Sequence, residues 1–320
     1  ALVAVFAALI APVVFDWTWE YPILVLAAGA LAPQHWLVDR VRRLWNSPGP
    51  WQWVAMLFTL LVIAALVAVL LNEGDGRFTR SQTALAFAAL TVVGVISVGK
   101  RAMFVAVLAA TLFLFGGWRS LLMTMQGDVR TRSYFGVYTV SDKIGFRQLS
   151  HGTTIHGIQL TGSPGLEALP TSYYTPGSGV GQAMLAADAL YGPRARIGVV
   201  GLGTGTLACY ARPGQRWSFY EIDPTVIQLA RDDGRFTFLK RCLPNPDIEL
   251  GDARLSLAAA APGGLDLLAL DAFSSDSVPM HLMTTEAFAA YARVLSPKGL
   301  LLVHISNRFM DLRPVVSAAA

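Results

Sequence analysis

The stretch Ile197-Gly198-Val199-Val200-Gly201-Leu202-Gly203-Thr204-Gly205 decides the fold of the second half of the chain. A short apolar run that ends in a glycine-rich turn predicts a buried strand followed by a tight backbone turn. Strands that alternate with helical stretches indicate a parallel, doubly wound α/β sheet. We therefore expect a Rossmann-like nucleoside-binding domain over residues 181–320. Its further strands are expected at Trp217–Ile222, Asp247–Leu250, Leu265–Leu270 and Leu300–Ile305.

Upstream of this domain, residues 126–180 predict a small β subdomain. The alternating runs Tyr134–Val140 and Gly145–Leu149 are typical of hairpin strands. The stretch Gly152–Gly179 is rich in Gly, Pro, Ser and Thr and contains Tyr173 and Tyr174. We expect it to form a loop that lies over another part of the molecule.

The first 118 residues are far more apolar than the rest of the chain. The whole sequence is 54% hydrophobic and 14% charged, against roughly 25% charged in soluble domains, which disfavours an ordinary cytosolic enzyme. Apolar stretches near the roughly 17 to 25 residues that cross a bilayer predict a bundle of about five transmembrane helices over residues 1–118. These stretches are Ala1–Phe15, Pro22–Val38, Trp53–Leu71, Thr83–Gly99 and Ala102–Trp118.

Charge and cysteine content exclude several other classes of protein. The formal net charge is +4, but no run of five Lys and Arg occurs, so we expect no nucleic-acid partner. The basic clusters divide equally between the two sides of the expected bundle and therefore do not orient it. Cys209 and Cys242 lie outside any metal-type spacing, so they predict neither a disulfide framework nor a zinc site. We expect two reduced thiols and no bound metal.

Candidate ligand-binding residues follow the predicted strands, where ligands bind in sheets of this kind. The turn Gly201–Gly205 departs from the dinucleotide pattern at Thr206 and is more typical of a site for an adenosyl group without a pyrophosphate. Glu221 lies twenty residues after Gly201 and is placed to accept hydrogen bonds from ribose hydroxyls. Asp252 and Asp271 follow the next two strands. The alternative for each acid is an ordinary helix cap.

Seven stretches together resemble the aminopropyltransferases, the spermidine and spermine synthases, over roughly residues 132–307. The closest resemblance is to bacterial membrane-anchored, spermidine synthase-like proteins, in which a domain of the class I methyltransferase-type fold follows transmembrane helices. The stretches are Ser133–Val137, His151–Thr154, Pro170–Tyr174, Gly201–Gly205, Tyr220–Asp223, Gly251–Ala253 and Asp271–Pro279.

The resemblance implies an enzyme that moves an aminopropyl group from decarboxylated S-adenosylmethionine to a diamine or polyamine. By that resemblance Asp271 is the catalytic carboxylate, which takes the proton of the attacking amine, while Glu221 holds the ribose and Asp252 the adenine. It also implies a homo-oligomer. Together with the apolar segments it indicates an integral protein of the cell membrane in contact with the lipid bilayer, and its soluble domain is expected in the cytoplasm, where adenosyl sulfonium donors are made. The remaining implied donor contacts are Gly201, Gly203, Thr204, Gly205 and Ala253, and the implied acceptor contacts are Tyr173, Tyr174 and Asp276.

Departures from the family pattern leave alternatives open. Soluble members carry an Asp in the glycine turn where this chain has Thr204, which favours a methyltransferase that uses S-adenosylmethionine. A third hypothesis is a non-catalytic membrane protein that binds polyamine or nucleoside. The sequence ends within a helix-like stretch, Leu312–Ala320, where the fold normally adds two antiparallel strands, so we expect a C-terminally truncated domain.

Overall fold

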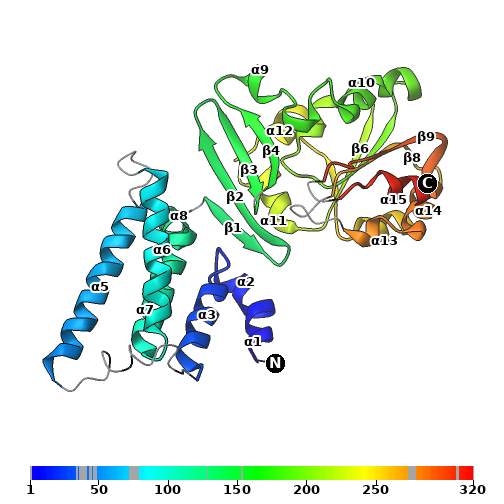
Figure 1. Cartoon of the computed structure of the whole chain (residues 1–320). Helices are drawn as coiled ribbons and strands as arrows, with labels where there is room; N and C mark the ends of the chain where they lie inside the picture. The colour runs from blue at the N-terminus through cyan, green and yellow to red at the C-terminus, as the bar shows by residue number, and fades with distance from the viewer. Residues whose placement is uncertain are drawn as a thin grey trace. The chain divides into compact units, whose positions relative to one another are not determined.

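The computed structural model describes residues 2–33, 35, 42, 45, 49–71, 79–127, 129–152, 154–272, 279–307 and 310–319. The chain forms two compact units, Ala1–Gly127 and Asp128–Ala320, which are described separately (Figure 1).

The first unit is helical. Ile63, Leu90 and Val107, one from each of α5, α6 and α7, form a buried apolar cluster. A capping box begins α6, in which Thr79 and Gln82 each satisfy a backbone amide of the other. The helices are α1 Leu2–Val5, α2 Ala11–Val14, α3 Glu20–Leu31, α5 Pro50–Leu71, α6 Arg80–Ser97, α7 Arg101–Leu112 and α8 Trp118–Gln126, with π-helical turns η1 Phe6–Ile10 and η3 Phe113–Gly117.

The expected bundle of about five transmembrane helices is not supported. Within the part of the chain that the structure describes, no helix is both long and apolar enough to span a bilayer. In the second expected segment, Pro22–Val38, α3 ends at Leu31 after 12 residues. Twelve helical residues rise only about 18 Å, short of the roughly 30 Å of a hydrocarbon core. The expectation of an integral membrane protein thus finds no support in the described helices.

The second unit begins with a four-stranded antiparallel sheet in the order β1-β2-β3-β4. The predicted hairpin strands Tyr134–Val140 and Gly145–Leu149 correspond to β2 and β3. A β-bulge between Leu149 and Ser150 shifts the register just before His151 at the end of β3. The strands are β1 Arg130–Ser133, β2 Gly136–Lys143, β3 Phe146–His151 and β4 Thr154–Leu160.

A five-stranded parallel sheet forms the rest of this unit, in the order β7-β6-β5-β8-β9. The chain builds outward from β5 through β6 to β7 and then returns to the other side of β5 with β8 and β9, so the order reverses between β5 and β8. This confirms the doubly wound, Rossmann-like sheet expected from the sequence. The strands are β5 Arg196–Val200, β6 Arg216–Glu221, β7 Asp247–Leu250, β8 Leu265–Leu270 and β9 Leu295–Val303.

Helices and short helical turns connect these strands. They are α9 Pro164–Glu167, η4 Ser172–Tyr174, α10 Gly179–Tyr191, η5 Thr206–Tyr210, α11 Pro224–Ile227, η6 Gln228–Asp232, α12 Phe238–Cys242, α13 Ala253–Ala259, η7 Met280–Leu282, α14 Thr285–Val294 and α15 Arg313–Ala319.

Alternating residues of the central strands bury both faces of the parallel sheet. Val199 of β5 packs in one apolar core with Met184 of α10, whereas Val200 packs in a second core with Leu257 of α13 and Phe288 of α14. Successive side chains of a strand point to opposite faces, so an uninterrupted apolar run needs helices on both. Figure 1 shows α10 on one side of the sheet and α13 and α14 on the other.

The two cysteines form a disulfide, which corrects the prediction of reduced thiols. Cys209 lies in η5 and Cys242 ends α12, and their Cα atoms are 4.8 Å apart, within the usual range for a disulfide. They are brought together because α12 packs beneath the glycine turn, where a Cβ on Gly205 would lie 2.8 Å from Cγ of Leu239. A separation of 33 residues in the chain gives no sign of this contact.

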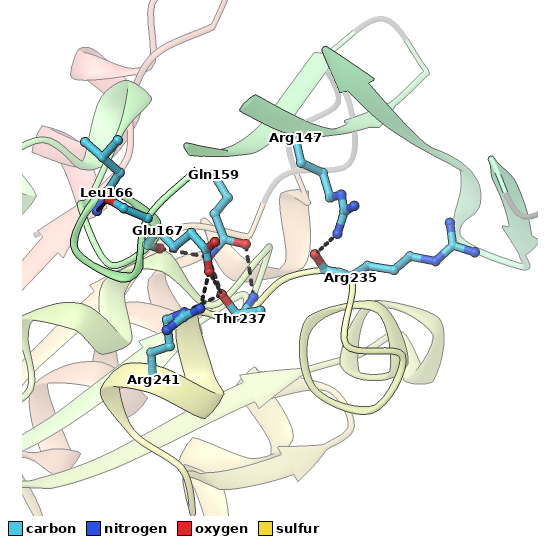
Figure 2. A network of polar contacts seen from close by, with 8 residues as sticks. Arg147, Gln159, Leu166, Glu167, Arg235, Thr237 and Arg241 are labelled. Carbon is cyan, nitrogen blue, oxygen red and sulfur yellow. Dashed lines mark hydrogen bonds and ion pairs between the residues drawn. The ribbon is translucent and has the colours of Figure 1, made fainter. Parts of the chain in front are cut away.

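A polar network attaches the small sheet to the parallel-sheet domain (Figure 2). The side chain of Gln159 in β4 donates hydrogen bonds to the carbonyl of Glu167 at 2.8 Å and to Oγ1 of Thr237 at 3.0 Å, and it accepts one from the amide of Thr237 at 3.0 Å. Arg241 of α12 pairs with the Glu167 carboxylate. Arg147 of β3 donates to the carbonyl of Arg235. These contacts fix the strands of the small sheet beside the carboxyl end of the parallel sheet.

Candidate functional site

A cavity of about 220 Å³ lies at the carboxyl ends of the parallel strands. The glycine turn after β5 forms one wall, where Gly201 and Gly203 have φ of +94° and +53°. A Cβ on Gly201 would lie 2.6 Å from the carbonyl oxygen of Asp271, and one on Gly203 would lie 3.1 Å from that of His156. Glycine is required at both positions because the backbone is left-handed and its neighbours are backbone atoms.

Glu221, the last residue of β6, lines the same cavity and is 7% exposed. Its carboxylate accepts hydrogen bonds from the amides of Leu202 and Asp223, both at 2.9 Å. Burial raises the pKa of this carboxyl group, and the backbone hydrogen bonds oppose that shift. Glu221 therefore ties the glycine turn to the end of β6 while facing the cavity.

Asp271 follows β8 and is held by two side chains. The hydroxyl of Tyr174 donates to its Oδ2, and Nδ1 of His304 lies 2.5 Å from its Oδ1. Burial, with the nearby charge of Asp271, raises the pKa of Tyr174 far above its ordinary value, so this hydroxyl stays protonated and acts as the donor. The carboxylate is thus fixed in orientation from both sides.

A second cavity, of about 370 Å³, lies beyond Asp271 and is lined by Tyr173, Ser178 and His304 among others. Tyr174 and Asp271 are the described residues that border both cavities. Among the described lining residues, neither cavity has a Lys or Arg, whereas Glu221 and Asp271 supply carboxylates. The arrangement suits two positively charged molecules that meet at Asp271.

Two histidines from the small sheet complete the first cavity. The ring of His151 lies 4.7 Å from that of Tyr138 and 5.5 Å from that of His156, measured between centroids. Burial, together with the neighbouring His151, lowers the pKa of His156 to about 4, so its imidazole is neutral near pH 7. Its Nε2 is buried without a hydrogen-bond partner among the described residues, and an unsatisfied polar atom facing a cavity is a candidate ligand contact.

Thr204, expected to contact the donor, does not line the cavity described here. Its side chain is 1% exposed, and its Oγ1 lies 2.8 Å from Oγ1 of Thr206. It packs against β4, where a Cβ on Gly157 would lie 2.3 Å from Thr204 Oγ1. Gly205 likewise packs against Leu239. Both residues act as supports of the turn.

Asp252 caps α13 and stands in the chain between Gly251 and Ala253, which both line the cavity. Its Oδ1 accepts hydrogen bonds from the amides of Arg254 at 2.8 Å and Leu255 at 3.4 Å. Its Oδ2 lies 3.7 Å from Nε2 of His281, which lines the cavity together with Ala253. The helix-cap alternative is therefore realised, although the carboxylate stays close to the site. Asp276 falls outside the described residues.

Two lining residues, His281 and His304, were missed by the sequence reasoning. The sequence could have indicated His304, because the residue after each parallel strand lies at the carboxyl edge of the sheet, where ligands bind. The predicted last strand ran to Ile305, whereas β9 ends at Val303 and places His304 at the strand end. His281 lies in a 3₁₀ turn with no regular pattern.

Comparison with known proteins links the chain to one enzyme by sequence. It is similar to a polyamine aminopropyltransferase. The identity is 33% over 132 residues with the enzyme of Vibrio vulnificus (strain CMCP6), a match that covers 39% of this chain and 42% of that enzyme. The chain thus spans less than half the length of this curated relative. No family model matches the sequence.

Similar solved structures include two spermidine synthases. A probable spermidine synthase from Corynebacterium glutamicum ATCC 13032 has 21% identity and a TM-score of 0.44, covering 54% of this chain and 62% of that chain. The spermidine synthase from Thermotoga maritima has 16% identity and a TM-score of 0.42, covering 60% and 59%. The fold described above rests on the sheet topology of this chain itself.

Proposed function

We propose that this chain transfers an aminopropyl group from decarboxylated S-adenosylmethionine to a diamine or polyamine. The observation that carries the proposal is that Asp271 and Tyr174 border both cavities. A donor in the first cavity and an amine in the second then meet at a fixed carboxylate. The similarity to a polyamine aminopropyltransferase supports the same reaction.

The first cavity is assigned to the donor. In this assignment the ribose hydroxyls of the donor lie against Glu221 and the sulfonium of the donor points toward Asp271. The rest of the adenosyl group lies against Gly201, Gly203 and Ala253. The decarboxylated donor carries an ammonium and a sulfonium, both positive, which match a cavity with two carboxylates and no Lys or Arg among its described lining residues. The α-carboxylate of S-adenosylmethionine would meet no Lys or Arg among these described residues.

The second cavity is assigned to the acceptor amine. Tyr173 and Tyr174 present aromatic rings to an alkylammonium, an arrangement that favours cations. Asp271 orients the reacting nitrogen toward the carbon next to sulfur, which is the main task in a displacement of this kind. The leaving group is a neutral thioether, so the sulfur needs no further charge stabilisation.

The methyltransferase alternative depended on Thr204. Because its side chain is buried against Gly157 and does not border the cavity, the absence of an Asp at this position does not favour a carboxylated donor. Asp252 is proposed to act at the adenine end, because its carboxylate lies 3.7 Å from Nε2 of His281, which lines the cavity.

Calorimetry with the full-length protein tests the proposal. We expect decarboxylated S-adenosylmethionine to bind at least tenfold more tightly than S-adenosylmethionine, and mass spectrometry to detect an aminopropylated product when a diamine is added. Asp271→Asn should abolish turnover, and Asp232→Asn, an exposed ion-paired surface position, serves as the matched control. Tighter binding of S-adenosylmethionine, or transfer of a methyl group, would overturn the proposal.

A further inference from the structure

His304 is placed beside Asp271 by the backbone as well as by its side chain. The amide of His304 donates to the carbonyl of Leu270 at 2.9 Å, which sets the end of β9 against the end of β8. The imidazole then reaches Asp271, with 2.5 Å between Nδ1 and Oδ1, and its side chain is 22% exposed. It borders the second cavity and is not among the residues that line the donor cavity.

The hydrogen bonds around Asp271 assign the proton on His304. An ionised carboxylate is acceptor-only, so the Nδ1 of His304 that contacts it is the donor. A neutral imidazole with its proton on Nδ1 carries its lone pair on Nε2. The same logic makes the carboxylate of a catalytic triad hold its histidine in the tautomer that accepts a proton.

Both oxygens of Asp271 are already in contact with other side chains. Tyr174 donates to one of them and His304 contacts the other. In water, imidazole is a stronger base than a carboxylate. The Asp271 carboxylate is therefore arranged to orient the imidazole of His304, which is the basic group of the pair.

We propose that His304 is the general base of the transfer reaction and that Asp271 holds it in place; this rests on the proposed function. The lone pair of the neutral acceptor nitrogen forms a bond to the methylene carbon next to sulfur. The carbon–sulfur bond breaks with its electron pair on sulfur, which becomes a neutral thioether. The proton of the amine moves to Nε2 of His304, and the resulting imidazolium is stabilised by the Asp271 carboxylate.

The surroundings of His304 fit this role. Its ring meets that of Tyr173 edge to face, with 5.3 Å between centroids. Among the described residues, the titratable groups placed around it are Tyr173 and Tyr174 from η4, Asp271 directly after β8 and His156 from β4. Burial raises the pKa of both tyrosines, and His156 is neutral near pH 7. Of these described groups, Asp271 is the carboxylate in contact with the imidazole.

His304→Gln tests the assignment, because a glutamine amide still donates to Asp271 but does not accept a proton at neutral pH. We expect kcat to fall on the order of 10²- to 10⁴-fold, with little change in donor Kd or acceptor KM. In His304→Ala, added imidazole should restore part of kcat.

Tyr191→Phe is the matched control, since it removes a hydrogen bond to β9 at the carbonyl of Lys298, 3.0 Å long, away from both cavities. Comparable melting temperatures for this variant and His304→Gln would separate folding from chemistry. An unchanged kcat in His304→Gln would overturn the role of His304 while leaving aminopropyl transfer intact. A wild-type protein that binds no donor and transfers nothing would overturn both.

Discussion

The hydroxyl of Tyr174 donates a hydrogen bond to the carboxylate of Asp271, joining residues 97 positions apart in the chain. This contact lies where the two cavities meet, and it connects the loop after the small sheet to the end of β8. Since burial keeps the hydroxyl protonated, Tyr174 is a permanent donor to the carboxylate that orients the reacting amine.

Tyr174→Phe should therefore lower kcat on the order of 10- to 100-fold, because a hydrogen bond to a charged group contributes roughly 1.5–3 kcal/mol. Tyr173→Phe is the control, as the contacts of its hydroxyl with described residues are longer, 3.4 Å to the carbonyl of Ile155 and 3.5 Å to Tyr174. Steady-state kinetics on both variants measures the difference. Equal losses would argue against a special role for the Tyr174 hydroxyl.

Glu221→Gln should weaken binding of both decarboxylated S-adenosylmethionine and methylthioadenosine at least tenfold. Both molecules contain the ribose assigned to this carboxylate. The side-chain amide of the substituted glutamine would also turn an N–H toward the backbone N–H of Leu202 or Asp223. Because that donor then loses its acceptor, the free energy of unfolding should fall by about 1–3 kcal/mol. Calorimetry and urea denaturation measure the two effects. Wild-type affinity for both ligands would place the ribose elsewhere.

His156 should titrate near pH 4 rather than near 6.5. Below pH 6.5 the unfolded chain takes up a proton that the folded chain does not, so stability falls with pH until His156 also protonates near pH 4. The full change is about 3 kcal/mol. NMR titration of the imidazole resonances measures the pKa, and His156→Phe should flatten this part of the stability profile. A midpoint above pH 6 would contradict the neutral, buried ring.

Reduction of the Cys209–Cys242 disulfide should destabilise the second unit. Opening a loop between residues 33 apart is expected to cost about 3–4 kcal/mol in the chain-entropy model. Thermal denaturation with and without dithiothreitol measures the loss, and Cys209→Ser/Cys242→Ser should match the reduced protein and no longer respond to reductant. Two free thiols in the untreated protein would contradict the bond.

Gly157→Ala should destabilise the glycine turn by about 1–3 kcal/mol, since overpacking a buried contact forces neighbours to move. The added Cβ would lie 2.3 Å from Oγ1 and 2.6 Å from Cγ2 of Thr204. Thr204→Ala removes both atoms, so the double variant should recover much of the loss in denaturant titrations. Additive losses would show that Thr204 does not pack there.

The parallel, doubly wound class of the sheet and the edge that carries the site followed from local sequence patterns. Apolar runs of strand length alternate with helical stretches, and the turn after Val200 contains glycines that a left-handed backbone requires. Glu221 and Asp271 were identified because each lies where such a run ends. These features depend on neighbours in the chain, so a sequence displays them directly.

Other features were decided by packing between distant segments. The side chain of Thr204 turned toward Gly157, Cys209 met Cys242, and His304 met Asp271 only when the sheets and helices were assembled. In the first unit, apolar composition alone did not define how far each helix extends. Composition and periodicity determine which faces of the helices and strands are buried. The direction in which a side chain points, and the residue it contacts, depend on contacts that form only in the folded chain.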